Sequence, residues 1–215
     1  MTEAAPLFDA DFVTQLDTLM RWRRDVRHFL PAPVSEADMQ HVFDAAALAP
    51  SVGNAQPWRF VRMRSSEIRE SLAKHVDACG RDAARYQADP DRQKLYLSLK
   101  LHGIREAPEL VAVFCESAPQ AGHGLGRGTM PETLRYSTVM AIHAMWLAAR
   151  ARGIGLGWVS ILDPATVHAM LNVPDSWELI AILCIGYPVS PTARPELEER
   201  GWQEREPLGE RIIER

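Results

Sequence analysis

The stretch that decides the fold of this chain is residues 131–160, PETLRYSTVMAIHAMWLAARARGIGLGWVS. Its first part, residues 131–152, predicts a long helix whose second half is apolar on nearly all faces, as expected for a central helix. Gly153 ends the helix naturally, because glycine readily adopts the left-handed conformation found after helices. Residues 156–161 then predict a strand. A central helix followed at once by a strand indicates an α+β domain.

Helix and strand patterns alternate over the rest of the chain, without an internal repeat or a dividing linker. Residues 91–105 are ambiguous, because their leucines alternate as in a strand whereas leucine and lysine favour a helix; a helix is the preferred interpretation. We therefore expect residues 1–215 to form one α+β domain. The other predicted helices cover residues 11–22, the segment from Ser35 to Pro50, residues 65–78 and a short segment capped by Asp163, and the other predicted strands cover residues 58–63, 109–115 and 178–187.

Composition and charge restrict the partners that this chain can bind. It has 24 Lys and Arg against 28 Asp and Glu residues, a net charge of −4, and 47% hydrophobic residues. A nucleic-acid or membrane-surface protein would need a basic excess, so neither partner is expected. The three cysteines form no Cys-x-x-Cys pair and the histidines have no metal-ligand spacing. We therefore expect no disulfide framework, no metal site and a reducing, cytoplasmic location.

The tail, residues 188–215, is rich in proline and charge but also carries apolar side chains such as Trp202, Leu208 and Ile212. Proline discourages regular structure. Apolar anchors need a surface to cover them, and a partner subunit is a reasonable candidate. We expect the tail to be an arm that packs on a partner subunit.

The first segment that could carry chemistry is Arg23-Arg24-Asp25-Val26-Arg27. Three guanidinium groups within five residues can bind a phosphate dianion through charge-assisted hydrogen bonds. A solvated basic patch is the alternative, and spacing alone favours neither interpretation.

Two further segments could contact a ligand. Residues 51–57, SVGNAQP, can present polar groups to a heteroaromatic ring, although a plain connection from helix to strand is the simpler interpretation. In residues 153–160, GIGLGWVS, alternate glycines indicate a close backbone approach, either to a flat ligand or to another strand. These glycines do not match the dinucleotide-binding pattern Gly-x-Gly-x-x-Gly. Ser160 could donate a hydrogen bond to a ligand, or it could be an ordinary hydroxyl at the end of a strand.

Taken together and in this order, the segments resemble the flavin-dependent nitroreductase superfamily over nearly the whole chain. Within it they are similar to the aerobic 5,6-dimethylbenzimidazole synthases, also called flavin destructases. The motifs that carry the resemblance are RRDVR (23–27), SVG (51–53), QPWRF (56–60), GLGR (124–127), MPET (130–133), GWVSILDP (157–164) and GYP (186–188).

The resemblance implies an α+β nitroreductase-like fold with a central, mostly antiparallel sheet flanked by helices. It also implies an intertwined homodimer with FMN in two interfacial sites. Reduced FMN, supplied by a separate flavin reductase, is then the substrate and O2 the co-substrate. The expected products are 5,6-dimethylbenzimidazole, the lower ligand of vitamin B12, and erythrose 4-phosphate. An FMN-dependent NAD(P)H nitro- or quinone reductase and a non-catalytic flavin carrier are the alternatives.

The resemblance also implies roles for individual residues. Asp25 matches the catalytic aspartate, a base for a ribityl carbon, and Ser160 matches the catalytic serine, which hydrogen-bonds the flavin ring. The loop at residues 124–127 resembles a lid over the flavin. The full set of expected FMN-binding residues is Arg23, Arg24, Asp25, Val26, Arg27, Ser51, Leu101, Ser160 and Arg205.

Overall fold

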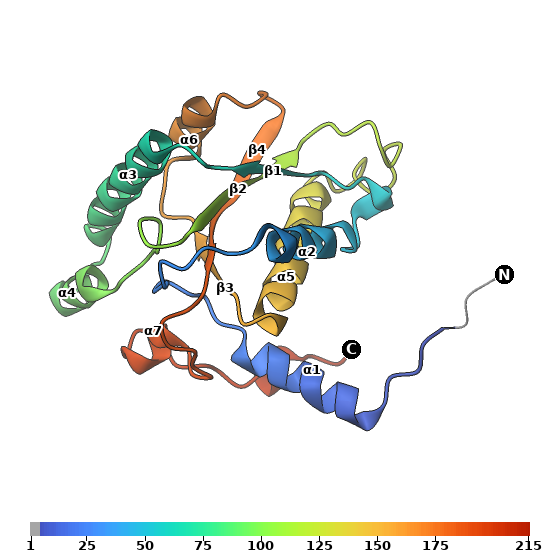
Figure 1. Ribbon diagram of the computed structural model, residues 1–215, viewed down its shortest axis with the longest axis horizontal. Helices are drawn as coiled ribbons and strands as arrows, with labels where there is room; N and C mark the ends of the chain where they lie inside the picture. Colours follow the sequence, from blue (N-terminus) through green and yellow to red (C-terminus); the bar gives the residue numbers. More distant parts are fainter. Residues whose placement is uncertain (1–4) are drawn as a thin grey trace.

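The computed structural model describes residues 5–215 as a four-stranded sheet covered by helices on both faces (Figure 1). The strand order is β1-β2-β4-β3, and every neighbouring pair is antiparallel. The predicted α+β architecture around a central antiparallel sheet is therefore confirmed. In chain order the elements are α1 (Ala10–Trp22), α2 (Glu36–Ala47), the 3₁₀ turn η1 (Val52–Asn54), β1 (Trp58–Arg62), α3 (Ser66–Ala84), α4 (Pro90–Ser98), β2 (Glu109–Glu116), α5 (Thr133–Ala151), β3 (Gly155–Val159), α6 (Pro164–Leu171), β4 (Trp177–Gly186), α7 (Glu196–Glu199) and the 3₁₀ turn η2 (Gly209–Arg211).

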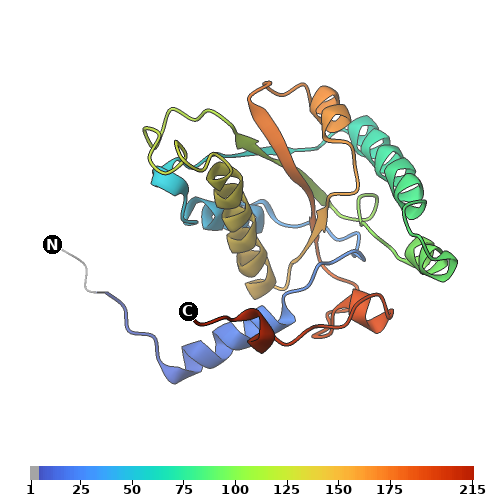
Figure 2. The ribbon, with the colours of Figure 1, turned by 180° about the vertical axis from the view of Figure 1, so that it is seen from behind.

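Strand β2 shows how the sheet divides the apolar side chains between two cores. Successive side chains of a strand point to opposite faces of the sheet. Val111 and Val113 therefore pack in one core with α2 and α5, whereas Leu110 and Ala112 pack in the other with α3 and α6. Both views of the ribbon show these two helix layers on opposite faces of the sheet (Figures 1 and 2).

Helix α5 is the central helix that its apolar surface predicts. Its residues Ile142, Met145 and Ala149 are completely buried against the sheet and α2. Gly153, with φ +73°, ends the helix as predicted, and the chain enters β3 two residues later. A rigid helix thus leads directly into the strand at the sheet edge.

Side-chain caps explain where two of the helices begin. Ser35 Oγ accepts a hydrogen bond from the Asp38 N–H at 3.0 Å at the start of α2. At the start of α6, Asp163 Oδ2 accepts one from the Thr166 N–H at 2.9 Å. Each cap satisfies a backbone donor that the helix itself leaves free.

Several element boundaries differ from the sequence prediction. Helix α3 continues to Ala84, which is buried, rather than ending at residue 78. The ambiguous segment is helical only over α4, and residues 99–105 are irregular. Strand β3 ends at Val159, so Ser160 follows the strand instead of lying within it.

The tail is mostly irregular, as its prolines predict, and its first part packs on its own subunit. The rings of Trp202 and Tyr96 lie 6.0 Å apart, and the Arg92 guanidinium lies 4.7 Å from the Trp202 ring centre. Leu208 and Ile212 near the end of the tail are 68% and 64% exposed. Packing on a partner subunit stays a prediction.

No helix within residues 5–215 combines the length and the apolar character needed to cross a membrane.

Candidate functional site

The arginine-rich segment pairs with the open edge of β3. The Val26 N–H donates to the Leu156 carbonyl at 3.1 Å, next to a parallel bridge between Asp25 and Leu156. Gly157 permits this approach, because a Cβ atom there would lie 2.0 Å from the Val26 carbonyl oxygen. The alternate glycines allowed close approach of either a flat ligand or another strand. The structure shows an extended segment of the same chain at this position.

Asp25 is held at both carboxylate oxygens, and its side chain is 31% exposed. Oδ1 accepts a hydrogen bond from the Trp158 backbone N–H at 2.7 Å, and Oδ2 accepts one from Arg27 Nε at 3.0 Å. Burial raises the pKa of the Asp25 carboxyl, and these two hydrogen bonds oppose that effect only in part. A carboxylate with a raised pKa accepts a proton more readily than an ordinary aspartate does.

Arg27 connects Asp25 to the loop that carries Leu101. Its Nη1 donates to the Lys100 carbonyl at 3.2 Å while its Nε contacts Asp25. The Arg27 side chain is only 12% exposed, so both bonds are partly shielded from water. The loop that carries Leu101 is thereby fixed beside the Asp25 carboxylate.

Ser160 lies at the same end of β3. Ser160 is exposed and lies two residues after Trp158, whose backbone N–H donates to Asp25. Two residues of extended chain span about 7 Å. The next residue, Ile161, lines a cavity of about 320 Å³ together with Leu101. The structure thus gathers Asp25, Leu101 and Ser160 around the end of β3.

Arg23 lies over the indole of Trp146, with its guanidinium carbon 4.9 Å from the ring centre. Burial lowers the pKa of Arg23, and so does the positive charge of Arg205, while Asp25 partly opposes them. Burial and the Arg205 charge also lower the pKa of Arg24. These three guanidinium groups therefore repel one another, and an anion between them would relieve the repulsion.

A small cavity of about 150 Å³ collects these charged groups. Four arginines and one aspartate line it, and Pro195, Glu196 and Leu197 of the tail form the rest of its wall. The excess of guanidinium groups suits a phosphate dianion. Since ligand pockets are usually about 300 Å³ or larger, the cavity can hold only part of a nucleotide. We call this region the arginine end; its residues are Arg23, Arg24, Asp25, Arg27 and Arg205.

Arg24 also fastens the tail to the body of the protein. Its guanidinium donates to the carbonyls of Arg21, Arg23 and Ala193, the last at 3.1 Å from Nε. Its own carbonyl accepts a hydrogen bond from Trp146 Nε1 at 3.0 Å. Arg24 therefore contributes its positive charge to the arginine end while its hydrogen bonds hold the backbone.

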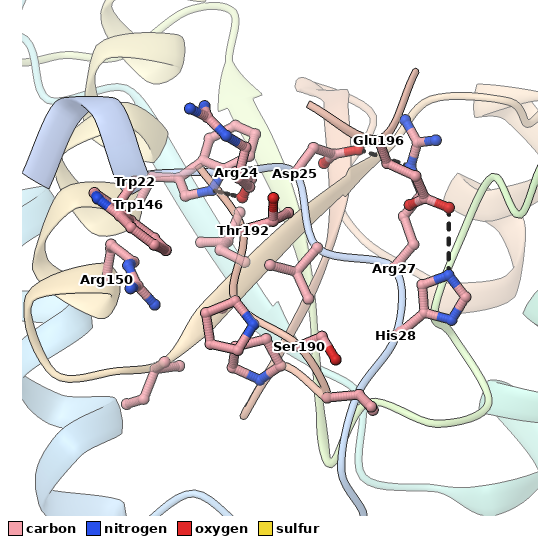
Figure 3. A pocket seen from close by; sticks show the side chains of 17 residues that line it. Trp22, Arg24, Asp25, Arg27, His28, Trp146, Arg150, Ser190, Thr192 and Glu196 are labelled. Carbon is pink, nitrogen blue, oxygen red and sulfur yellow. Dashed lines mark hydrogen bonds and ion pairs between the residues drawn. The ribbon is translucent and has the colours of Figure 1, made fainter. Parts of the chain in front are cut away.

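A larger cavity of about 290 Å³ shares Arg24, Asp25 and Arg27 with the small one. Figure 3 shows Trp146 on one side of it and His28 and Glu196 on the other. His28 Nε2 and Glu196 Oε1 lie 3.3 Å apart and link the tail to the segment after the arginines. The arginine end thus contributes residues to two neighbouring cavities.

Ser51 lies away from the arginines. The neighbouring Val52 N–H donates to Ser137 Oγ at 3.0 Å, near the start of α5, whereas Arg24 is bound by Trp146 near the end of the same helix. Ser137 and Trp146 are nine positions apart, which corresponds to roughly 13 Å along the helix axis. Ser51 and the arginines are therefore held towards opposite ends of α5.

The glycine-rich loop packs on the Ser51 loop. Gly53 has φ +55°, and a Cβ atom there would lie 2.9 Å from the Leu125 carbonyl oxygen. Gly122 approaches the Gly53 carbonyl equally closely and has φ +79°. Both loops therefore lie at the start of α5, and we call residues 51–57 and 117–132 together the glycine end.

Two groups in this site escaped the sequence analysis. The long helix was predicted correctly, but Trp146 received no role in it; an indole N–H on a largely buried side chain needs a hydrogen-bond acceptor, which was the available signal. The Trp158 N–H that binds Asp25 is a backbone group. Residue types cannot reveal a contact of that kind.

The cysteines and possible metal ligands lie outside this chemistry. Cys79, Cys115 and Cys184 are free thiols, and burial raises the pKa of Cys184 to about 12. Within residues 5–215, no cluster of three or more His, Cys, Asp or Glu side chains could hold a metal ion.

Known proteins are similar to this chain in sequence and in fold. The model of the nitroreductase family matches residues 20–187. The 5,6-dimethylbenzimidazole synthase of Rhodospirillum rubrum is 54% identical over 202 residues, which cover 94% of this chain and 95% of that protein. A protein of the same name from Rhodobacter capsulatus is 48% identical over 192 residues, or 89% of this chain and 92% of that protein. The crystal structure of oxidized iodotyrosine deiodinase bound to FMN and 3-iodo-L-tyrosine has a TM-score of 0.70 at 25% identity, covering 82% of this chain and 91% of that one. The chain therefore belongs to the nitroreductase family and, within it, to the 5,6-dimethylbenzimidazole synthases.

Proposed function

We propose that this chain converts reduced FMN and dioxygen into 5,6-dimethylbenzimidazole, with erythrose 4-phosphate and a fragment that carries the pyrimidine carbons and nitrogens of the ring as the other products. The observation that carries the proposal is the largely buried Asp25 carboxylate set among arginines. An arginine clamp alone would suit any FMN protein. A proton-accepting group beside the clamp suits a reaction that must remove a proton from carbon. The two relatives named 5,6-dimethylbenzimidazole synthase support the same reaction.

The arginine end fits the phosphate group of FMN. The positive charge of Arg205 lowers the pKa of both Arg23 and Arg24, so a dianion among these guanidinium groups is favoured. Arg24 adds charge, and Arg27 directs its guanidinium towards Asp25 and the adjoining loop. Reduced FMN, supplied by a separate flavin reductase, provides the ring carbons of the product and the electrons that reduce dioxygen.

Asp25 acts as the base that removes a proton from the ribityl carbon next to the flavin ring. The Trp158 N–H and Arg27 Nε hold its two oxygens in one orientation. The raised pKa that burial gives the carboxyl increases its proton affinity. Ionised Asp25 is thus oriented before the substrate binds.

Ser160 and Leu101 contact the flavin ring in this proposal. Both lie near Asp25 at the end of β3. The exposed Ser160 hydroxyl is free to donate a hydrogen bond to a polar edge of the ring. Leu101 and Val26 offer apolar contact beside it.

A second copy of the chain completes the site. In one chain the lid-like loop lies at the glycine end, away from the arginines. In a dimer with two-fold symmetry, the glycine end of one chain can meet the arginine end of the other. Two equivalent FMN sites then form at the interface.

The exposed apolar surface of the chain supports such a dimer. Every side chain of α1 is at least partly exposed, although the helix is amphipathic. Large exposed apolar side chains on an amphipathic helix are typical of an interaction site. The partner is also a suitable surface for the end of the arm. The exposed apolar residues concerned are Phe12, Val13, Leu16 and Met20 of α1, Tyr136, Val139 and Met140 of α5, and Leu208, Ile212 and Ile213 of the arm.

Aerobic incubation with excess reduced FMN tests the reaction. Loss of flavin absorbance, together with 5,6-dimethylbenzimidazole detected by mass spectrometry, is the expected result. Sustained NADPH oxidation with an added nitroaromatic, without loss of flavin, would instead indicate a reductase. Tight FMN binding without either reaction would indicate a flavin carrier.

Mixed dimers test the shared site. One chain carries Asp25→Asn, which disables its arginine end. The other chain carries Ser51→Trp, which blocks its glycine end. If each site uses Asp25 of one chain and Ser51 of the other, random mixing restores one intact site in half of the dimers, or about a quarter of normal activity. No recovery on mixing, in dimers verified by mass, would exclude a site shared in this way.

A further inference from the structure

We propose that Trp146 is a positioning residue of the FMN site, which sets the Arg23 guanidinium and the Asp25 carboxylate in place together. This inference rests on the proposed function, because it takes FMN as the ligand of the arginine end. Trp146 is carried by α5 and lines the larger cavity beside Arg24 (Figure 3). Three contacts join the one indole to both charged groups.

The first contact holds the Arg23 side chain. Its guanidinium lies over the Trp146 ring, 4.9 Å from the ring centre. An arginine side chain has several freely rotating bonds, and ordering it opposes binding. Stacking on an aromatic face orders the guanidinium while leaving its N–H groups free to bind phosphate.

The second contact holds the backbone between the two charged groups. Trp146 Nε1 donates to the Arg24 carbonyl at 3.0 Å. This carbonyl belongs to the peptide bond that joins Arg24 to Asp25. The position of the Asp25 backbone therefore depends on a hydrogen bond from the same indole that orders Arg23.

The third contact reaches the carboxylate of Asp25 through a neighbouring ring. The Trp146 and Trp158 rings are stacked, with centres 6.5 Å apart and planes inclined by 16°. The Trp158 backbone N–H donates to Asp25 Oδ1 at 2.7 Å. Trp146 thus supports the residue whose backbone orients the carboxylate.

The scaffold behind Trp146 is rigid enough for this role. The adjacent Met145 and the residues one turn away, Ile142 and Ala149, are completely buried in the core. A residue on such a helix is positioned more accurately than one on a loop. Trp146 therefore anchors the extended segment 23–27, which forms few backbone hydrogen bonds of its own, to the rigid core.

Two substitutions separate the contacts. Trp146→Phe keeps an aromatic face for Arg23 but removes the N–H that binds the Arg24 carbonyl. Trp146→Leu removes both. Trp177→Phe is the matched control, because its indole Nε1 donates to Glu116 Oε2 at 3.0 Å and lies outside the arginine end.

The measurement is the affinity of each folded variant for FMN and for riboflavin, by equilibrium dialysis under air with the oxidised flavins. The dissociation constant of riboflavin divided by that of FMN isolates the contribution of the phosphate to binding. We expect Trp146→Leu to reduce this ratio about tenfold and Trp146→Phe about threefold, since the cation–π contact is retained in the latter. Riboflavin affinity should change little, and Trp177→Phe should leave the ratio unchanged even if it lowers the melting temperature.

An unchanged ratio in Trp146→Leu, or an equal loss of affinity for both flavins, would overturn the positioning role. A wild-type protein that fails to bind FMN would overturn the proposed function itself, which distinguishes the two failures. Product formation at saturating FMN gives a second readout. It should fall in both Trp146 variants because Asp25 loses its fixed backbone, and a normal rate in Trp146→Leu would contradict that part of the proposal.

Discussion

The two ends of α5 are built in opposite ways. At the arginine end, charged side chains lie on an extended segment that is fixed by the β3 edge, Trp146 and the tail. At the glycine end, backbone turns with positive φ stack on one another, and few charged groups take part. Under the proposed function, the first end binds the phosphate and accepts a proton, whereas the second encloses the flavin. In the proposed dimer, each chain would therefore contribute two different and complementary halves of a site.

The largest expected effect comes from Asp25→Asn, at the chemical centre of the arginine end. Removal of a general base lowers a rate by about 10²–10⁴-fold. We expect 5,6-dimethylbenzimidazole formation to fall by that amount, measured by chromatography of the aerobic reaction. FMN affinity should stay within about threefold, since asparagine still accepts from the Trp158 N–H. A normal product yield from this variant would refute the base assignment.

The next effect concerns the close approach on which the arginine end depends. In Gly157→Ala, the new methyl group would meet the Val26 carbonyl oxygen at 2.0 Å. The segment must shift, and we expect the free energy of unfolding to fall by about 1–3 kcal/mol. Urea denaturation measures it.

Gly128→Ala is the control for this substitution in the glycine end. Its methyl group would lie 3.5 Å from the Gly124 carbonyl oxygen, which is ordinary contact, and its φ is not positive. Its effect should stay within about 0.5 kcal/mol. Equal destabilisation by both substitutions would show that the β3 edge is not the specific constraint.

Gly53→Ala tests the glycine end in the same way as Gly157→Ala tests the arginine end. Its φ of +55° and the nearby Leu125 carbonyl make alanine unfavourable, by roughly 1–2 kcal/mol of folding free energy. Since the glycine end is proposed to enclose the flavin, product yield should fall. The ratio of FMN to riboflavin affinity should not change, because the phosphate lies at the other end. A changed ratio in equilibrium dialysis would contradict this division.

The smallest effect is a pH dependence of stability caused by Asp25. Burial raises the folded-state pKa of this carboxyl above 3.8, its ordinary value, so the folded protein binds the proton more tightly than the unfolded chain. Ionised Asp25 therefore destabilises the fold at neutral pH, and this penalty disappears as the pH falls through the raised pKa towards 3.8. Asp25→Asn should melt at a higher temperature than the wild type at neutral pH, with a difference that shrinks on acidification. A difference that grows on acidification would show that the pKa is lowered instead.

Local patterns predicted most of the fold but little of the assembly of the site. The buried face of α5, the Ser35 cap and the apolar strand β2 follow from periodicity and hydrogen-bonding residue types. The extension of α3 to the buried Ala84 does not follow from these patterns. Asp25 and the arginines could be singled out by charge. Their contacts with Trp146, Trp158 and the Lys100 carbonyl join segments far apart in sequence, and each of these three hydrogen bonds uses a backbone atom that every residue possesses.

The pairing of the arginine-rich segment with β3 also bears on solubility. β3 is the last strand of the sheet, and its outer edge would otherwise present unpaired N–H and carbonyl groups. Such edges recruit strands from other molecules and lead to aggregation. Here the segment proposed to bind the phosphate also covers that edge, and the glycines of β3 let it lie close enough to do so. Any change that releases the segment would therefore expose the unpaired edge of β3 and also remove the arginines from the anion pocket. Loss of ligand affinity and aggregation would then occur together.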